Sequence, residues 1–232
     1  MKLEFDDELN KRELIGALIL FVLYFFLLPY LVRLPEGLND AQRELIRCGV
    51  SVLLCFVLLG GWLRRGFDRL CENFGLCLRC FLLAWVMSWF IAMLVGSIEL
   101  SFMPAESENP NQEAIGSLLG ADFGMTAAAS IFLAPIVEEC IFRGGLFCGI
   151  RPVNRIWAYA AASLVFSLCH ILPFVTGTGD LRYLLFTLEY LPVGLVMCWC
   201  YEKSGSIWTS IFFHMSYNYL AVNALKLLDS ML

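Results

Sequence analysis

The second half of the chain contains polar residues whose types and spacing suit hydrolytic chemistry. A carboxylate beside an imidazole can activate a water molecule as a general base. Imidazole and amide N–H groups can stabilise the oxyanion that forms when water attacks a carbonyl carbon. These groups occur here within strongly apolar stretches, where ionisable residues are costly and usually mark function. The candidates are Glu138, Glu139, Arg143, His170, His214 and Asn218.

Peptide hydrolysis is the reaction that these groups fit best. Glu138 together with His170 can hold and deprotonate water, while His214 and Asn218 can donate hydrogen bonds to the oxyanion. The same two histidines and Glu138 can alternatively bind Zn²⁺, which takes such ligands in catalytic sites. The residue types alone therefore leave the metal question open.

Helical spacing separates the two adjacent glutamates. Glu139 and Arg143 are four residues apart with the acid first, so they can pair on one helix face as a supporting ion pair. Glu138 points about 100° away from Glu139 and remains available for chemistry. Pro135, three residues before Glu138, is expected to weaken or kink the helix there.

The composition indicates a membrane protein. Of the 232 residues, 59% are hydrophobic and 16% are charged, against about 45–50% and 25% in soluble domains. The net charge is −5 and no basic block is present, so nucleic acid is not an expected partner. Most of the 10 cysteines lie within apolar runs and are interpreted as free, buried thiols. Cys77 and Cys80 form one isolated C-x-x-C, which is weak evidence for metal binding.

The apolar segments predict an all-α, multi-pass transmembrane bundle with about seven spans. We expect no cleavable signal peptide and interpret the first apolar run as the first span. An eighth span would arise if the fourth segment were two pieces. The division expected is 1–124 for the first three spans and an outer loop, and 125–232 for a catalytic core. The spans are 14–32, 45–63, 81–103, 125–150, 156–175, 183–201 and 207–228.

Loop charge predicts the orientation. The 64–80 loop carries four arginines, whereas the 104–124 loop has acids and no Lys or Arg. Because cationic loops stay in the cytoplasm, we expect the N-terminus inside and the C-terminus outside.

At a rise of about 1.5 Å per residue, Glu138 and His170 lie roughly 18 and 21 Å into their spans. His214 and Asn218 lie roughly 10 and 16 Å in, so the depths overlap.

Three motifs resemble those of the CPBP family, the CAAX proteases and bacteriocin-processing enzymes. Residues 138–143 fit E-E-x-x-x-R, residues 166–170 fit F-x-x-x-H, and residues 214–218 fit H-x-x-x-N. This family includes the type II CAAX prenyl endopeptidase. The order and spacing match over about residues 125–222, and each motif falls on its own span.

The resemblance implies an intramembrane endopeptidase that acts on membrane-associated peptides or proteins. It implies Glu138 as the base with His170, and His214 with Asn218 on the oxyanion side. It favours a metal-independent glutamate mechanism without a cofactor, and Zn²⁺ is the less favoured alternative. The compact chain is similar to bacterial members, so the plasma membrane is the expected location.

Two alternatives from other classes stay open. A non-catalytic membrane scaffold or a bacteriocin-immunity factor can share this fold, although neither needs all four catalytic-type residues. A small transporter would need a continuous path of ionisable groups, to which Glu189 is the sole additional candidate. The G-x-G-D at residues 177–180 falls in an expected loop and has no partner aspartate within a span. The substrate and the oligomeric state are not indicated by the sequence.

Overall fold

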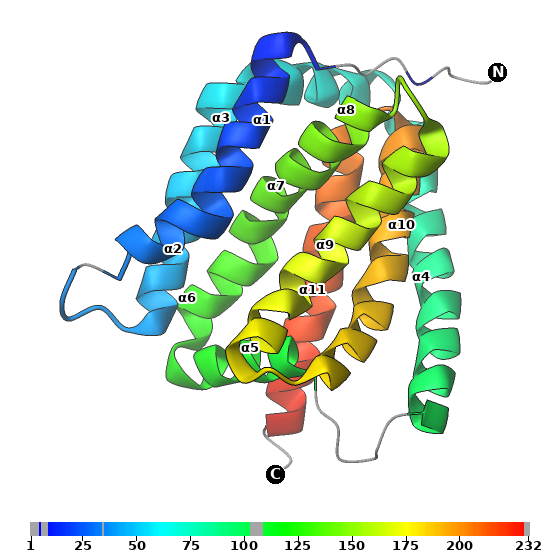
Figure 1. Cartoon of the computed structure of the whole chain (residues 1–232). Helices are drawn as coiled ribbons and strands as arrows, with labels where there is room; N and C mark the ends of the chain where they lie inside the picture. Colours follow the sequence, from blue (N-terminus) through cyan, green and yellow to red (C-terminus); the bar gives the residue numbers. More distant parts are fainter. Residues whose placement is uncertain (1–4, 6–8, 34, 103–108, 230–232) are drawn as a thin grey trace.

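The computed structural model describes residues 5, 9–33, 35–102 and 109–229, and these form a bundle of helices (Figure 1). No strand occurs among these residues, which confirms the predicted all-α class. The helical elements follow one another closely, and two long segments combine α-helical and π-helical turns. In chain order the elements are α1 (Lys11–Val22), η1 (Leu23–Leu27), α2 (Leu28–Leu31), α3 (Asp40–Glu72), α4 (Phe74–Phe102), α5 (Pro110–Ala121), α6 (Phe123–Ala127), η2 (Ala128–Leu133), α7 (Ala134–Glu139), η3 (Cys140–Phe147), α8 (Cys148–Ile150), α9 (Arg155–Thr178), η4 (Leu181–Phe186), α10 (Thr187–Ser204) and α11 (Ile207–Asp229).

The multi-pass membrane architecture is confirmed by the lengths and composition of the helices. Within the described ranges, 6 helical segments are long and apolar enough to cross a membrane: Lys11–Leu31, Asp40–Glu72, Phe74–Ile98, Phe123–Ile150, Arg155–Thr178 and Leu181–Ser204. The segment expected as a seventh span forms α11, a helix of 23 residues. It is long enough to cross but falls outside the six, since His214, Asn218 and Asn223 make it less apolar. The fourth segment is continuous, so it does not supply an eighth span.

Two expected loops are largely helical. The 64–80 segment was expected to be a loop because it lies between two apolar spans, but α3 continues to Glu72 and α4 starts at Phe74. Cations interact favourably with the C-terminal end of a helix, so arginines there do not end α3. The 104–124 segment contains α5, whose start has an Asn109 N-cap followed by a proline, a favourable combination. Residues 104–108 of that expected loop lie outside the described residues.

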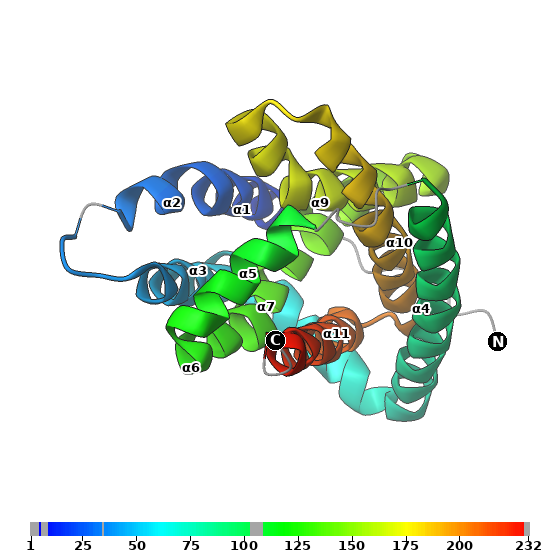
Figure 2. The same cartoon turned by 90° about the horizontal axis from the view of Figure 1, so that it is seen from below.

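The segment containing α7 and η3 lies inside the bundle, where it contacts α1, α3, α9 and α11 (Figures 1 and 2). One continuous core joins residues of both expected regions, among them Trp62 and Phe142, which are fully buried. By contrast, α4 exposes large apolar side chains such as Trp89, Phe90 and Met93 along the bundle edge. Such a surface is suited to lipid, because the helix satisfies its own backbone hydrogen bonds.

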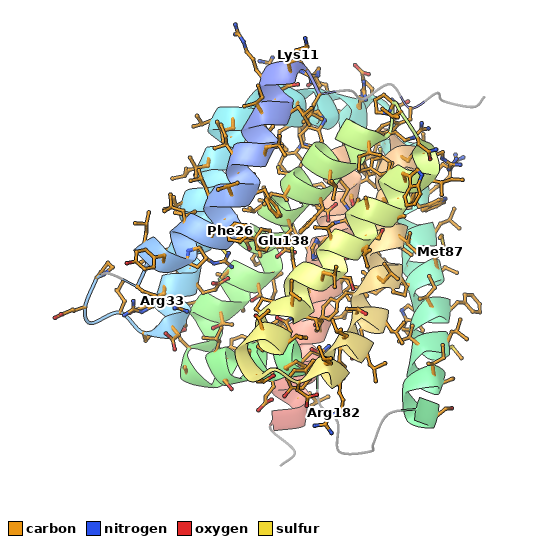
Figure 3. The ribbon with its side chains drawn as sticks, viewed as in Figure 1. Lys11, Phe26, Arg33, Met87, Glu138 and Arg182 are labelled. Atoms are coloured by element: carbon orange, nitrogen blue, oxygen red, sulfur yellow. The ribbon has the colours of Figure 1, made fainter. Side chains whose placement is uncertain are left out.

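Two groups of charged residues lie at the end of the bundle where α1 begins. Glu13 at the start of α1 accepts hydrogen bonds from Arg65 near the end of α3, at 3.0 and 2.8 Å. Glu202 of α10 accepts hydrogen bonds from Arg151 and Arg155 at 2.7 Å each. Figure 3 places Lys11 at this end and Arg182 at the opposite end, with Glu138 between them. The presence of Arg65, Arg151 and Arg155 together at this end agrees with the charge asymmetry of the loops in the sequence.

Candidate active site

Helix geometry changes at the two adjacent glutamates. Glu138 and Glu139 are the last residues of α7, and the π-helical turn η3 begins directly after them. A second π-helical turn, η2, precedes α7, so the chain stays helical at Pro135 instead of breaking there. Short π-helical turns inserted in α-helices occur frequently at functional sites. The glutamates therefore lie between two irregular turns in the interior of the bundle.

Glu139 is the centre of a buried network. Its Oε1 accepts hydrogen bonds from Arg143 Nη1 at 2.9 Å and from His214 Nδ1 at 3.0 Å, and Ser210 Oγ donates to Oε2 at 2.6 Å. Arg143 also donates from Nη2 to the Gly194 carbonyl at 3.0 Å. The Glu139 and Arg143 side chains are both 0% exposed, so the expected ion pair is present and fully desolvated. This network joins η3, α10 and α11 around the site.

Glu138 has different surroundings. Its Oε2 lies 3.8 Å from His170 Nε2 and 3.7 Å from His214 Nε2, and its side chain is 12% exposed. This oxygen is buried and has no hydrogen-bond partner among the described residues. Polar contacts longer than about 3.5 Å commonly involve a shared water molecule. The geometry therefore suits one small polar group, such as a water molecule, that the Glu138 carboxylate and the two imidazoles share.

The partners of Nδ1 orient both imidazoles. His170 Nδ1 lies 2.8 Å from the Phe166 carbonyl, and because a carbonyl only accepts, this nitrogen carries the proton. His214 Nδ1 lies 3.0 Å from the Glu139 carboxylate, which likewise favours a proton on Nδ1. Each ring therefore presents Nε2 to Glu138. The ring of Phe166 packs against both imidazoles, at centroid distances of 4.5 and 5.8 Å.

Asn218 lies one turn after His214 on α11. Its Nδ2 donates a hydrogen bond of 2.8 Å to the Ser130 carbonyl in η2. The π-helical geometry of η2 changes the normal pattern of backbone hydrogen bonds there, and Asn218 provides a hydrogen-bond donor for the Ser130 carbonyl. Asn218 thus ties α11 to the helix that carries Glu138, and its direct participation in chemistry remains a prediction.

Sequence reasoning missed two residues that contact the site. Ser210 is four residues before His214, so helical spacing placed it on the same face and could have identified it. Tyr190, whose ring stacks on His170, comes from a separate helix and had no detectable signal in the sequence. The G-x-G-D segment lies at the end of α9, where Gly179 has φ of 76° and Asp180 pairs with Arg182.

The expected thiols and metal sites can also be compared with the structure. All ten cysteines are free, including Cys77 and Cys80. Within the part of the chain that is described, no three His, Cys, Asp or Glu side chains gather closely enough to hold a metal ion. The independence of the chemistry from metal remains a prediction.

Comparisons with known proteins match the region of the chain that carries the candidate residues to a peptidase family. Residues 121–220, which contain all six candidate residues, match the family model described as type II CAAX prenyl endopeptidase Rce1-like. The chain is 28% identical over 178 residues to the "Putative membrane peptidase YdiL" of Bacillus subtilis, covering 76% of this chain and 67% of that protein. It is 33% identical over 98 residues to the "UPF0177 protein YxdF" of Lactococcus lactis, covering 42% of this chain and 49% of that protein. No solved structure matches this chain.

Proposed function

We propose that this membrane protein is an intramembrane endopeptidase, because residues 121–220 match the family model of the type II CAAX prenyl endopeptidase Rce1-like proteins. Its substrates would be membrane-associated peptides or proteins. The observation that carries the proposal is the Glu138 carboxylate, whose Oε2 is buried and faces Nε2 of both histidines at 3.8 and 3.7 Å. A carboxylate and an imidazole that share a water molecule can take a proton from it.

In the proposed reaction, Glu138 acts as the general base. Water held between Glu138 and His170 attacks the carbonyl carbon of the scissile peptide bond, and its proton passes to the Glu138 carboxylate. Nε2 of His170 is an acceptor because Nδ1 carries the proton, so it can orient this water. When the tetrahedral intermediate collapses, the C–N bond breaks and Glu138 returns the proton to the leaving amine. The products are a carboxylate and an amine.

His214 is suited to the oxyanion side of the same reaction. Its Nδ1 donates to Glu139, and this negative charge can balance the imidazolium that forms when Nε2 is protonated. A protonated Nε2 would donate a hydrogen bond to the oxyanion. Asn218 can contribute its second amide N–H, because the hydrogen bond to Ser130 uses one of the two. The different partners of the two Nδ1 atoms thus support different roles for the two histidines.

The reaction is proposed to need no metal ion or cofactor. Zinc bound by Glu138 and the two histidines is the competing mechanism, and it predicts loss of activity on chelation. The bacterial relatives support a location in a bacterial plasma membrane. The identity of the peptide substrate, and any requirement for a prenyl group, are to be determined by the cleavage assay.

The test is cleavage of a library of membrane-anchored peptides by the purified protein in detergent. We expect Glu138→Gln to lower kcat by about 10²–10⁴-fold, the usual contribution of a general base. The matched control is Glu72→Gln, at an exposed acid where α3 ends, which should retain wild-type activity. A strong chelator should leave the wild type active, and loss of activity would favour zinc. A folded wild type that cleaves none of the library would favour the scaffold or immunity role.

A further inference from the structure

The two site histidines are held in different ways. His214 is fixed by a hydrogen bond to the buried Glu139 carboxylate. His170 has only a backbone carbonyl as its Nδ1 partner, and its ring lies parallel to the ring of Tyr190, with centroids 4.7 Å apart and planes at 20°. Stacked aromatic rings prefer a defined offset geometry, so Tyr190 restricts rotation of the imidazole.

Tyr190 is itself held by the beginning of α5. Its hydroxyl accepts hydrogen bonds from Asn111 Nδ2 at 3.0 Å and from Asn109 Nδ2 at 3.2 Å. The preceding residue, Glu189, accepts hydrogen bonds from Asn109 Nδ2 and from Gln112 Nε2, both at 2.7 Å. Two consecutive residues of α10 therefore bind the first turn of α5 through several hydrogen bonds.

The helix α5 lies across the end of the bundle that is opposite to the end carrying Lys11 (Figures 1, 2 and 3). Leu119 of α5 packs in a small cluster with Ile131 of η2 and Val222 of α11. A continuous series of contacts thus runs from the bundle end, through α5 and Tyr190, to the His170 ring and its Nε2 facing Glu138.

We infer that Tyr190 is a positioning residue for His170, and that the first turn of α5 acts on the site by holding the Tyr190 hydroxyl. The effect of this arrangement on catalysis rests on the proposed function, whereas its effect on the imidazole does not. Loss of the Tyr190 ring would let His170 rotate away from Glu138. Loss of the hydroxyl alone would loosen the ring while keeping the stack.

The chain offers a direct readout, because it has only two histidines. Histidine-specific ¹⁵N labelling of the purified protein gives two sets of imidazole signals, which His214→Gln assigns. We expect Tyr190→Leu to shift the His170 signals and reduce the share of the Nδ1–H tautomer, while the His214 signals stay in place. Tyr190→Phe should give a smaller change in the same signals. Tyr183→Leu, at a nearby tyrosine that packs against Phe186, is the matched control.

Kinetics provide the second readout. Misplacing a reacting group by about 1 Å can cost about 10²-fold in rate, so Tyr190→Leu should lower kcat by about 10–100-fold with KM little changed. Unaltered His170 signals in Tyr190→Leu would overturn the inference, even if activity fell through loss of stability. Shifted signals with wild-type kcat would remove the catalytic part. Shifted signals in a protein whose wild type cleaves nothing would keep the positioning role and reject the proposed function.

Discussion

Glu138 and Glu139 are neighbours in the sequence, but their carboxylates have opposite surroundings. Glu139 accepts hydrogen bonds from three side chains, whereas Oε2 of Glu138 accepts none among the described residues. One acid is therefore fully used in holding the structure, and its neighbour has a buried oxygen free to bind a proton or water. This difference predicts separable effects of the same substitution at the two positions.

The first prediction compares Glu138→Gln with Glu139→Gln. Glu138→Gln should abolish most cleavage while keeping the wild-type melting temperature, because Oε2 of Glu138 has no hydrogen-bond partner among the described residues that would be lost. Glu139→Gln should lower the melting temperature, since it leaves a buried arginine without its charge partner, a loss of about 3–5 kcal/mol. Thermal unfolding in detergent and kcat should be measured for both. Equal loss of stability in the two variants would contradict the division of roles.

The second prediction concerns the ion pair between Glu139 and Arg143. Removing both charges should cost less stability than removing either one, because a single substitution leaves the other charge buried and unpaired. The melting temperatures of Glu139→Leu, Arg143→Met and the double variant form a double-mutant cycle. The double variant should melt above both single variants yet remain inactive, as His214 has lost its Nδ1 partner. Additive losses would show that the two side chains act independently.

The third prediction tests Ser210, which donates to Glu139 Oε2 at 2.6 Å. Ser210→Ala removes the donor without adding bulk, and an unsatisfied buried acceptor costs about 1–3 kcal/mol. We expect a lower melting temperature and a moderate loss of kcat, through freer movement of Glu139 and His214. The control is Ser97→Ala on α4, whose exposed hydroxyl bonds to the Met93 carbonyl. A similar change in both variants would assign no special role to Ser210.

The sequence contained enough information to predict most of the residues that the structure brings together in the candidate site. Glu139 and Arg143 could be paired because an i, i+4 spacing fixes which side chains meet on one helix. The grouping of His170 and His214 with Glu138 followed from polar residues at overlapping depths in separate spans. Both inferences use only local geometry and the cost of burying charge, which are readable along the chain.

Contacts between distant segments were not predictable in the same way. Tyr190 lies against His170 because α9 and α10 pack together, and nothing in the spacing along one helix determines that partner. The π-helical turns beside Glu138 and Ser130 also escaped prediction, since their apolar sequence fits an ordinary α-helix equally well. The loop predicted over 64–80 was wrong because the helix was taken to end with its apolar part, whereas α3 continues to Glu72.

The last prediction tests the close packing behind the site. A Cβ at Gly144 would lie 2.9 Å from Trp62 Cη2, and Trp62 is fully buried and has little room to move. Gly144→Ala should therefore destabilise the protein, by about 1–3 kcal/mol as for other overpacked cores. The displacement would fall on η3, next to Arg143, so kcat should fall as well.

Gly60→Ala provides the matched control on α3. A Cβ there meets nothing within 4 Å, so alanine should be tolerated or should stabilise the helix by about 0.5–1 kcal/mol. The two variants carry the same chemical change, and only Gly144→Ala is expected to lower the melting temperature. If Gly144→Ala melts at or above the wild-type temperature, Trp62 can yield, and the close contact between α3 and η3 does not determine the position of Arg143.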